Sequence, residues 1–379
     1  MITLLHHGFD YIVPFLVILT VLVFVHEFGH YFVARRNGVR IDVFSIGFGP
    51  ELFGWHDRAG TRWKFSAIPL GGYVKMFGDM DASSGLPVAG AARMSAAERA
   101  VSFHGKRLAQ RTAIVAAGPA ANFVFAIVAL AILLMTYGQP FTPARVGQVQ
   151  SGSAAEHAGI KPGDMIVSIN GDRVGSFEDV QQEVRLNPGS PMTLVVKRDG
   201  HDLSVQATPA KTELTDRFGN HYEIGLLGIA RNGVDYVRRN PATAVYQAGA
   251  ETWNLTASTM DALWQIVKGT RGTDELGGPL RIAQMSGEVA QGGIVPIVWF
   301  MAVLSINLGL INLFPVPVLD GGHLLFYAAE ALRGRPLGQR AQEFGFRIGL
   351  ALVVTLMVFA TWNDLVHLRI VEFVKRLVT

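Results

Sequence analysis

The sequence predicts a polytopic α-helical membrane protein with about four transmembrane helices, a membrane-associated β-hairpin and one small α+β domain outside the cytoplasm. Half of the 379 residues are hydrophobic and only 17% are charged, whereas soluble domains carry about 25% charged residues. The apolar residues gather in four long uncharged stretches, and a more ordinary charge content returns between the second and third. This composition argues against a disordered chain or a small disulfide scaffold.

Each uncharged stretch, with short flanks, is long enough to cross a bilayer, which takes about 20 mostly apolar residues. No basic segment precedes the first stretch and no small-residue cleavage site follows it, so we expect a retained helix rather than a cleaved signal peptide. Buried core helices are the alternative, but two of the runs are too long for ordinary core helices. The predicted spans are residues 1–36, 111–137, 289–323 and 347–379.

The charges beside these stretches predict their orientation. Basic residues outnumber acidic ones from 35 to 111 and cluster again from 333 to 347, whereas acidic residues are slightly more numerous from 138 to 288. The positive-inside rule therefore places the loops 37–110 and 324–346 in the cytoplasm, and places 138–288 and both termini outside it. The net charge of +3 gives no indication of a nucleic-acid partner, and we expect none.

Residues 37–110 contain a strand pattern, in which Trp63, Phe65 and Ala67 alternate with polar residues. Gly71–Gly72 indicates a turn or bulge in the same segment. We expect either a surface hairpin or a hairpin that enters the membrane, where irregular backbone is tolerated if protein buries it or if it lines a cavity. Residues 81–100 are predicted to form a mobile loop.

Residues 138–230 are predicted to fold as the external domain. The run 158–171 follows the pattern A-G-[IL]-x-x-G-D-x-I-x-x-[IV]-N-G, which resembles the PDZ domains of bacterial proteases, and it occurs once. We expect a short helix before this run and a strand at 165–169. Asn170–Gly171 and Asp199–Gly200 are predicted to form two-residue hairpin turns.

Residues 231–288 are predicted to link the external domain to the third span. Good helix formers fill 241–268, so we expect a helix there. Its large apolar residues have no clean period, and the helix is expected either at the membrane surface or against the external domain.

A metal-binding motif lies in the first predicted span. His26 and His30 flank Glu27 in an H-E-x-x-H pattern, and side chains four apart on a helix share one face. Two imidazoles on one face can bind a zinc ion, and the intervening glutamate is placed to take a proton from the attacking water. Ionisable residues within a transmembrane segment are costly and are usually functional, although a solvated cluster at the end of a helix is the alternative.

A catalytic zinc site needs a third protein ligand, and a sequence without cysteine leaves His, Asp or Glu for it. Asp320 is the first charge after the third uncharged stretch, and it lies on the same side of the membrane as the H-E-x-x-H motif in the predicted topology. Pro315 and Pro317 break the helix ahead of it, which frees backbone groups to line a cavity. His323 is the rival ligand.

These motifs resemble the site-2 protease family of intramembrane zinc metalloproteases. The shared features are H-E-F-G-H in the first span, the PDZ domain and the N-x-x-P-x-P-x-L-D-G run at 312–321. Further matches are G-F-G-P at 47–50, P-L-G-G-Y-V-K-M at 69–76 and G-P-x-x-N at 118–122. The resemblance is to the bacterial branch that regulates sigma E, in a form with a single PDZ domain.

The resemblance implies a role for each matching residue. His26, His30 and Asp320 would bind Zn2+, and Glu27 would be the catalytic base. The hairpin would hold an unwound substrate segment as an added strand. The residues implied in substrate binding are Asn312, Gly71, Gly72, Tyr73 and Asn122.

The implied function is hydrolysis of peptide bonds within transmembrane segments of single-span membrane proteins, such as anti-sigma factors or remnant signal peptides. Another protease would cut these substrates first, and the lipid bilayer would be the other partner. The chain would lie in the bacterial inner membrane, with its active site near the cytoplasmic side and its PDZ domain in the periplasm. The alternatives are an inactive scaffold that binds peptides through its PDZ domain, and a transporter, which four spans without evident internal repeats match poorly.

Overall fold

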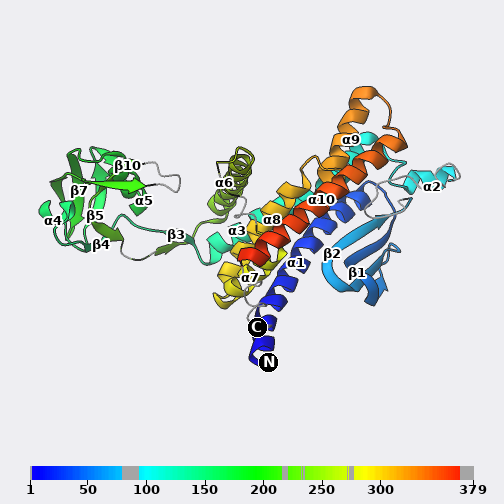
Figure 1. Cartoon of the computed structure of the whole chain (residues 1–379), viewed down its shortest axis with the longest axis horizontal. Coiled ribbons are helices and arrows are strands. Elements are labelled where there is room, and N and C mark those ends of the chain that lie inside the picture. The colour runs from blue at the N-terminus through cyan, green and yellow to red at the C-terminus, as the bar shows by residue number, and fades with distance from the viewer. Residues whose placement is uncertain are drawn as a thin grey trace. The chain divides into compact units, whose positions relative to one another are not determined.

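The computed structural model divides the chain into two compact units, which are Met1–Leu133 with Pro241–Thr379, and Leu134–Asn240 (Figure 1). Most of the loop predicted at 81–100 and the end of the predicted fourth span lie outside the described residues. The structure describes residues 2–78, 94–215, 221–231, 233, 235–270, 272 and 277–367.

Within the described residues, four helices are long and apolar enough to cross a membrane, which agrees with the number of spans predicted from the sequence. Helices suit such segments because they satisfy every backbone hydrogen bond internally. Pro14 and Pro119 lie inside two of these helices without ending them. The four helices are α1 (Ile2–Arg36), α3 (Leu108–Thr136), α8 (Ile294–Asn312) and α10 (Gln339–His367).

Shorter helices complete the first unit. A helix fills the predicted segment 241–268, and a short helix begins at Asp320, immediately after the loop that follows α8. The short helix before α3 begins with a capping box, in which Ser95 and Glu98 exchange hydrogen bonds. These helices are α2 (Ala96–Val101), α6 (Pro241–Val267), α7 (Pro279–Gln291) and α9 (Asp320–Arg333).

A buried carboxylate on α10 holds the start of α7. Asp364 is 2% exposed, and it accepts hydrogen bonds from the backbone N–H groups of Gly278, Leu280 and Arg281 at 2.8, 3.0 and 3.1 Å. These N–H groups belong to the first turn of a helix, where no intrahelical acceptor exists. α7 also packs along α1, and no pattern in the sequence distinguished α7 from the predicted linker.

The hairpin consists of β1 (Ile41–His56) and β2 (Arg62–Met76), which pair with register shifts. Residues 43–46 of β1 pair twice, with 72–75 and with 62–65. Because residues 43–46 have partners on both sides, the segment 72–76 is an edge of the sheet, with one strand partner among the described residues. The predicted bulge at Gly71–Gly72 lies where β2 passes from one pairing to the other.

Aromatic packing seats the hairpin on α1. Phe44 is fully buried, its ring stacks on Trp63 with centroids 4.2 Å apart, and Tyr31 of α1 meets it edge-on at 5.6 Å. The same apolar cluster includes Ile114 of α3. The hairpin and the two helices therefore share one core.

The second unit is a small α+β domain whose main sheet has the strand order β6-β5-β7-β8. The turns at Asn170–Gly171 and Asp199–Gly200 have positive φ at both residues, as two-residue hairpin turns require. The helices are α4 (Ala154–His157) and α5 (Phe177–Leu186). The strands are β3 (Gln139–Phe141), β4 (Val146–Val149), β5 (Met165–Ile169), β6 (Asp172–Arg173), β7 (Met192–Arg198), β8 (His201–Ala207), β9 (Ala210–Thr215), β10 (His221–Leu226), β11 (Ile229–Arg231) and β12 (Asp235–Val237).

The ion pair between Asp164 and Arg198 joins the turn before β5 to the end of β7. Arg198 donates to both carboxylate oxygens of Asp164 at 2.7 and 2.6 Å, and the Lys161 amide donates at 2.8 Å. Burial by itself raises the pKa of Asp164, but the hydrogen bonds from Arg198 and Lys161 outweigh it and hold that pKa below its ordinary value. The charged carboxylate therefore stabilises the fold of this unit.

We expect this contribution to be complete above about pH 4, the pKa of an unfolded aspartate, and to be lost as pH falls through the lower folded-state pKa of Asp164. The stabilisation by Asp164 can be measured as protection factors, from hydrogen exchange of the β5 and β7 amides in the full-length protein. Arg198→Met should lower protection at neutral pH. Lys211→Met removes the exposed pair with Glu223 and should change nothing; equal effects of the two variants would contradict the assignment.

Candidate metal centre

Two histidines of α1 and the first residue of α9 converge at one point. His26 and His30 lie one helical turn apart, and their Nε2 atoms are 3.3 Å from each other. Oδ2 of Asp320 is 3.1 Å from Nε2 of His26 and 3.4 Å from Nε2 of His30. These three residues form the one group in the described part of the chain that could hold a metal ion.

The approach of Asp320 depends on a tight reversal of the chain after α8. Pro315 and Pro317 follow the end of α8, and the chain enters α9 at Asp320 within a few residues. A Cβ atom on Gly321 would lie 2.2 Å from the Leu313 carbonyl oxygen, and one on Gly322 would lie 2.4 Å from that of Val316. Glycine at both positions therefore permits the backbone contact that delivers the carboxylate.

The three donor atoms fit a zinc ion. Ligands about 2.0 Å from a tetrahedral zinc lie about 3.3 Å from one another, and the observed separations are 3.1, 3.3 and 3.4 Å. Oδ2 of Asp320 is buried and meets no donor in the described residues other than the two imidazoles. Two imidazoles and one carboxylate form a known catalytic zinc set that leaves a fourth position open.

Glu27 lies beside this group in a cavity of about 260 Å³. The backbone N–H of Val74, on the edge segment of β2, is hydrogen bonded to the Glu27 carboxylate. A Cβ atom on Gly72 would lie 3.3 Å from Cγ of Glu27 and 2.7 Å from the Ser45 carbonyl oxygen, so this segment approaches the glutamate closely. The cavity is lined by His26, Glu27, His30, Gly72, Tyr73, Val74, Met76, Phe103, Val115, Asn312, Val318, Leu319, Asp320, His323 and Tyr327.

The residues predicted to bind substrate occupy different places. Gly72, Tyr73 and Asn312 line the cavity. Gly71 adjoins it with a φ of 156°, and a Cβ atom there would collide with the Phe48 ring. Asn122 is fully buried, and its amide lies 3.1 Å from Nδ1 of His26, outside the cavity lining.

Several lining residues were not predicted from the sequence. Val74 lies within the P-L-G-G-Y-V-K-M run, so the motif contained a signal for it. Phe103 and Tyr327 belong to no motif, and only the folded chain brings them to the cavity. His323 lines the cavity too, but it is not part of the group whose ligand atoms converge.

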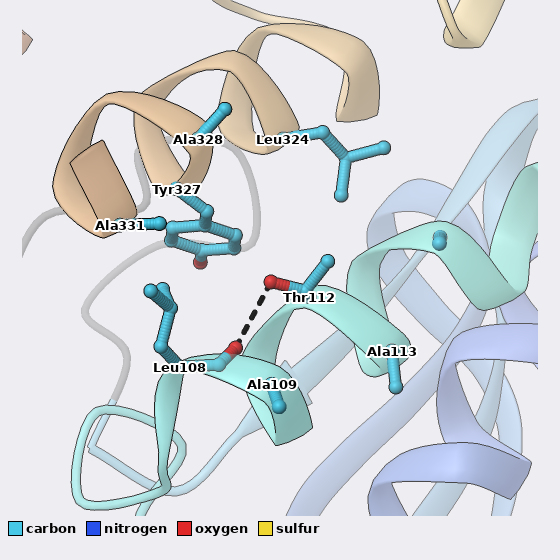
Figure 2. A pocket seen from close by; sticks show the side chains of 9 residues that line it. Leu108, Ala109, Thr112, Ala113, Leu324, Tyr327, Ala328 and Ala331 are labelled. Atoms are coloured by element: carbon cyan, nitrogen blue, oxygen red, sulfur yellow. Dashed lines mark hydrogen bonds between the residues drawn. The ribbon is translucent and has the colours of Figure 1, made fainter.

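A second, apolar cavity of about 690 Å³ lies between α3 and α9 and shares Tyr327 with the first. Figure 2 shows the Tyr327 ring reaching from α9 toward Leu108, and the Thr112 hydroxyl donating to the Leu108 carbonyl. That hydroxyl is therefore satisfied within its own helix, and the cavity presents an almost wholly apolar surface. Its lining is Leu108, Ala109, Thr112, Ala113, Ala116, Leu324, Tyr327, Ala328 and Ala331.

Asp57 fastens the hairpin to the helix that carries the histidines. One of its oxygens accepts from the Tyr31 hydroxyl at 3.0 Å and from the Trp63 indole N–H at 3.1 Å. The other accepts from the backbone N–H groups of Ala59 and Thr61. Tyr31 directly follows His30, so this carboxylate links the hairpin turn to the segment of α1 that carries the two histidines.

The apolar helices together with a two-histidine, one-carboxylate site define a membrane metalloprotease. The family description "Peptidase family M50" matches residues 14–356, and the chain belongs to this family. It is 50% identical to "Putative zinc metalloprotease Atu1380" of Agrobacterium fabrum, over 94% of this chain and 95% of that protein. It is 37% identical to "Metalloprotease MmpA" of Caulobacter vibrioides, over 97% of this chain and 98% of that protein.

Among solved structures, the PDZ domain of the SdrC-like protein Lmo2051 from Listeria monocytogenes aligns with 24% of this chain and 88% of its own. The sequence identity is 16% and the TM-score is 0.19. The family and the relatives' names, together with the donor set, make this chain a zinc metalloprotease, as the sequence predicted.

Gly118→Ala should weaken zinc binding, because a Cβ atom at 118 would lie 2.2 Å from Nε2 of His30 and would displace a ligand. We expect a loss of at least about tenfold in zinc affinity, measured by chelator competition. Gly249→Ala, on α6, meets nothing within 4 Å and serves as the matched control. Unchanged zinc affinity in Gly118→Ala would mean that the His30 imidazole does not need the space that glycine leaves at position 118.

Asp57→Asn should loosen the hairpin while leaving the metal bound, because it weakens charge-assisted hydrogen bonds and touches no ligand. We expect about tenfold slower cleavage, which corresponds to about 1.4 kcal/mol, with normal zinc content by elemental analysis. Asp42→Asn, on the same hairpin but paired at the exposed surface with Arg40, should cleave normally. Loss of zinc in Asp57→Asn would refute this division of roles.

Proposed function

We propose that this chain is an intramembrane endopeptidase that hydrolyses peptide bonds within transmembrane segments of single-span membrane proteins. The observation that carries the proposal is the location of the reactive groups. His26, Glu27 and His30 lie on α1 within a segment apolar enough to cross a membrane. A protease whose base and metal ligands lie at that depth is suited to a peptide bond that is itself in the bilayer.

The edge of the hairpin would hold the substrate. A helix hides its peptide bonds in its own hydrogen bonds, so the substrate must unwind before a base can reach it. The segment 72–76 lies beside Glu27 and has one strand partner among the described residues, and an extended peptide can add to such an edge through main-chain hydrogen bonds. Gly71, Gly72 and Tyr73 would shape this added strand, and Asn312 would hydrogen bond to it from the end of α8.

Glu27 would move the proton in hydrolysis. A zinc ion held by His26, His30 and Asp320 would supply Lewis-acid activation of the water and the scissile carbonyl. Glu27 would accept a proton from the attacking water and deliver it to the nitrogen of the leaving amine.

We further propose that the chain lies in the bacterial inner membrane, with the metal site near the cytoplasmic face and the second unit in the periplasm. The support is the excess of basic residues beside the metal helix and the second span. The PDZ-like unit would admit substrates that another protease has already trimmed. An inactive scaffold is the alternative, but no observation favours it, because the ligands and the base are all present.

The decisive test replaces the base alone. Glu27→Gln keeps the size of the side chain and both imidazoles, so the protein should retain zinc and lose cleavage of a model transmembrane substrate by about 10²–10⁴-fold. Glu178→Gln, on the exposed surface of α5, is the matched control. Wild-type cleavage by Glu27→Gln would exclude it as the base, and cut sites found only outside the substrate's membrane segment would exclude intramembrane proteolysis.

A further inference from the structure

One face of α3 is aligned with the two histidines of α1. Ile114, Gly118 and Asn122 are spaced by four residues and therefore share a face. His26 and His30 have the same spacing on the opposing helix. Ile114 and Asn122 each meet the Nδ1 atom of one imidazole, and Gly118 lies against the ring of His30.

The contacts with Ile114 and Gly118 fix the ring of His30. Its Nδ1 lies 2.9 Å from the carbonyl oxygen of Ile114, which can only accept a hydrogen bond, so Nδ1 carries the proton. This leaves the Nε2 lone pair for a metal. The ring lies directly on Gly118, where any side chain would occupy the space of the imidazole.

The third contact involves His26, and here the partner is a side-chain amide. The atom placed 3.1 Å from Nδ1 of His26 is Nδ2 of Asn122, whereas Oδ1 of this fully buried side chain meets no partner among the described residues. The placement of its oxygen and nitrogen is decided by the hydrogen-bond network. A histidine that binds a metal through Nε2 donates from Nδ1, so the amide atom that faces it must be the oxygen.

A third helix holds Asn122 in place. The Ser305 hydroxyl of α8 donates to the backbone carbonyl of Asn122 at 2.9 Å, and Ser305 is fully buried. A Cβ atom on Gly309 would lie 3.2 Å from Cβ of Asn122, so α8 and α3 are in close contact at this point. α8 therefore contacts the backbone carbonyl and the Cβ atom of Asn122, while the side-chain amide faces the imidazole of His26.

We propose that Asn122 is a positioning residue for zinc, whose Oδ1 accepts from Nδ1–H of His26 and so presents Nε2 of His26 to the metal. α3 thereby supplies an acceptor to each histidine, a backbone carbonyl for His30 and a side-chain amide for His26. The inference deepens the zinc site and does not depend on which peptide the enzyme cuts. It also separates Asn122 from the residues that line the substrate cavity.

The test measures zinc affinity of the full-length protein in detergent by chelator competition. Asn122→Leu keeps the approximate volume and removes the acceptor, so zinc binding should weaken about 10–100-fold. Asn122→Asp keeps an acceptor oxygen and should bind zinc at least as tightly as the wild type. Asn307→Leu, on α8 and bonded to Thr259, is the matched control and should not change zinc affinity.

Three results would overturn the proposal. Wild-type zinc affinity in Asn122→Leu would show that His26 needs no acceptor. Equal weakening in the Leu and Asp variants would show that Asn122 matters through packing alone. Loss of cleavage with unchanged zinc affinity would return Asn122 to the substrate site. If Asn122→Leu does not fold, Asn122→Ser, which shortens the side chain away from His26, replaces it in the same comparison.

Discussion

Three ionisable side chains meet at a point that apolar helices surround, and much of the first unit is arranged to satisfy them. Burying an ionised group costs about several kcal/mol unless a partner compensates. His26, His30 and Asp320 face one another at hydrogen-bond distances, and a bound cation would complete the compensation of their charges. This requirement accounts for the abrupt start of α9 after α8, and for two glycines where the loop crosses its own backbone.

The same centre fixes the hairpin. Val74 reaches Glu27 from the edge of the sheet, and Asp57 reaches Tyr31 from the turn. The hairpin is therefore attached to α1 at Glu27, between the two histidines, and at Tyr31, directly after the second. A strand that is held in this way can pair with a peptide along its edge without losing its position relative to Glu27, which is the preorganisation that catalysis by positioning requires.

Local patterns in the sequence predicted the parts that depend on local rules. The four long helices follow from uncharged runs, the turns of the second unit from Asn-Gly and Asp-Gly, and Asp320 from its isolation as a charge. Contacts between distant segments were not predictable. The double pairing of residues 43–46 is invisible in an alternation pattern, and the place of Asn122 behind His26 depends on how α3 packs on α1. Asp364 directly follows the fourth uncharged stretch, yet nothing near it in the sequence indicates that it accepts hydrogen bonds from the distant amides at the start of α7.

The carboxylate of Asp364 has a mechanical consequence. α10 cannot separate from α7 without leaving a charge and three amide groups unpaired in an apolar setting. α7 in turn packs along α1, where Gly287 leaves room for Tyr11. The last long helix and the helix that carries both imidazoles are thus joined through a short segment lying between them in the chain. Because α7 contacts both helices, a change in the tilt of α10 would also move α7 against α1.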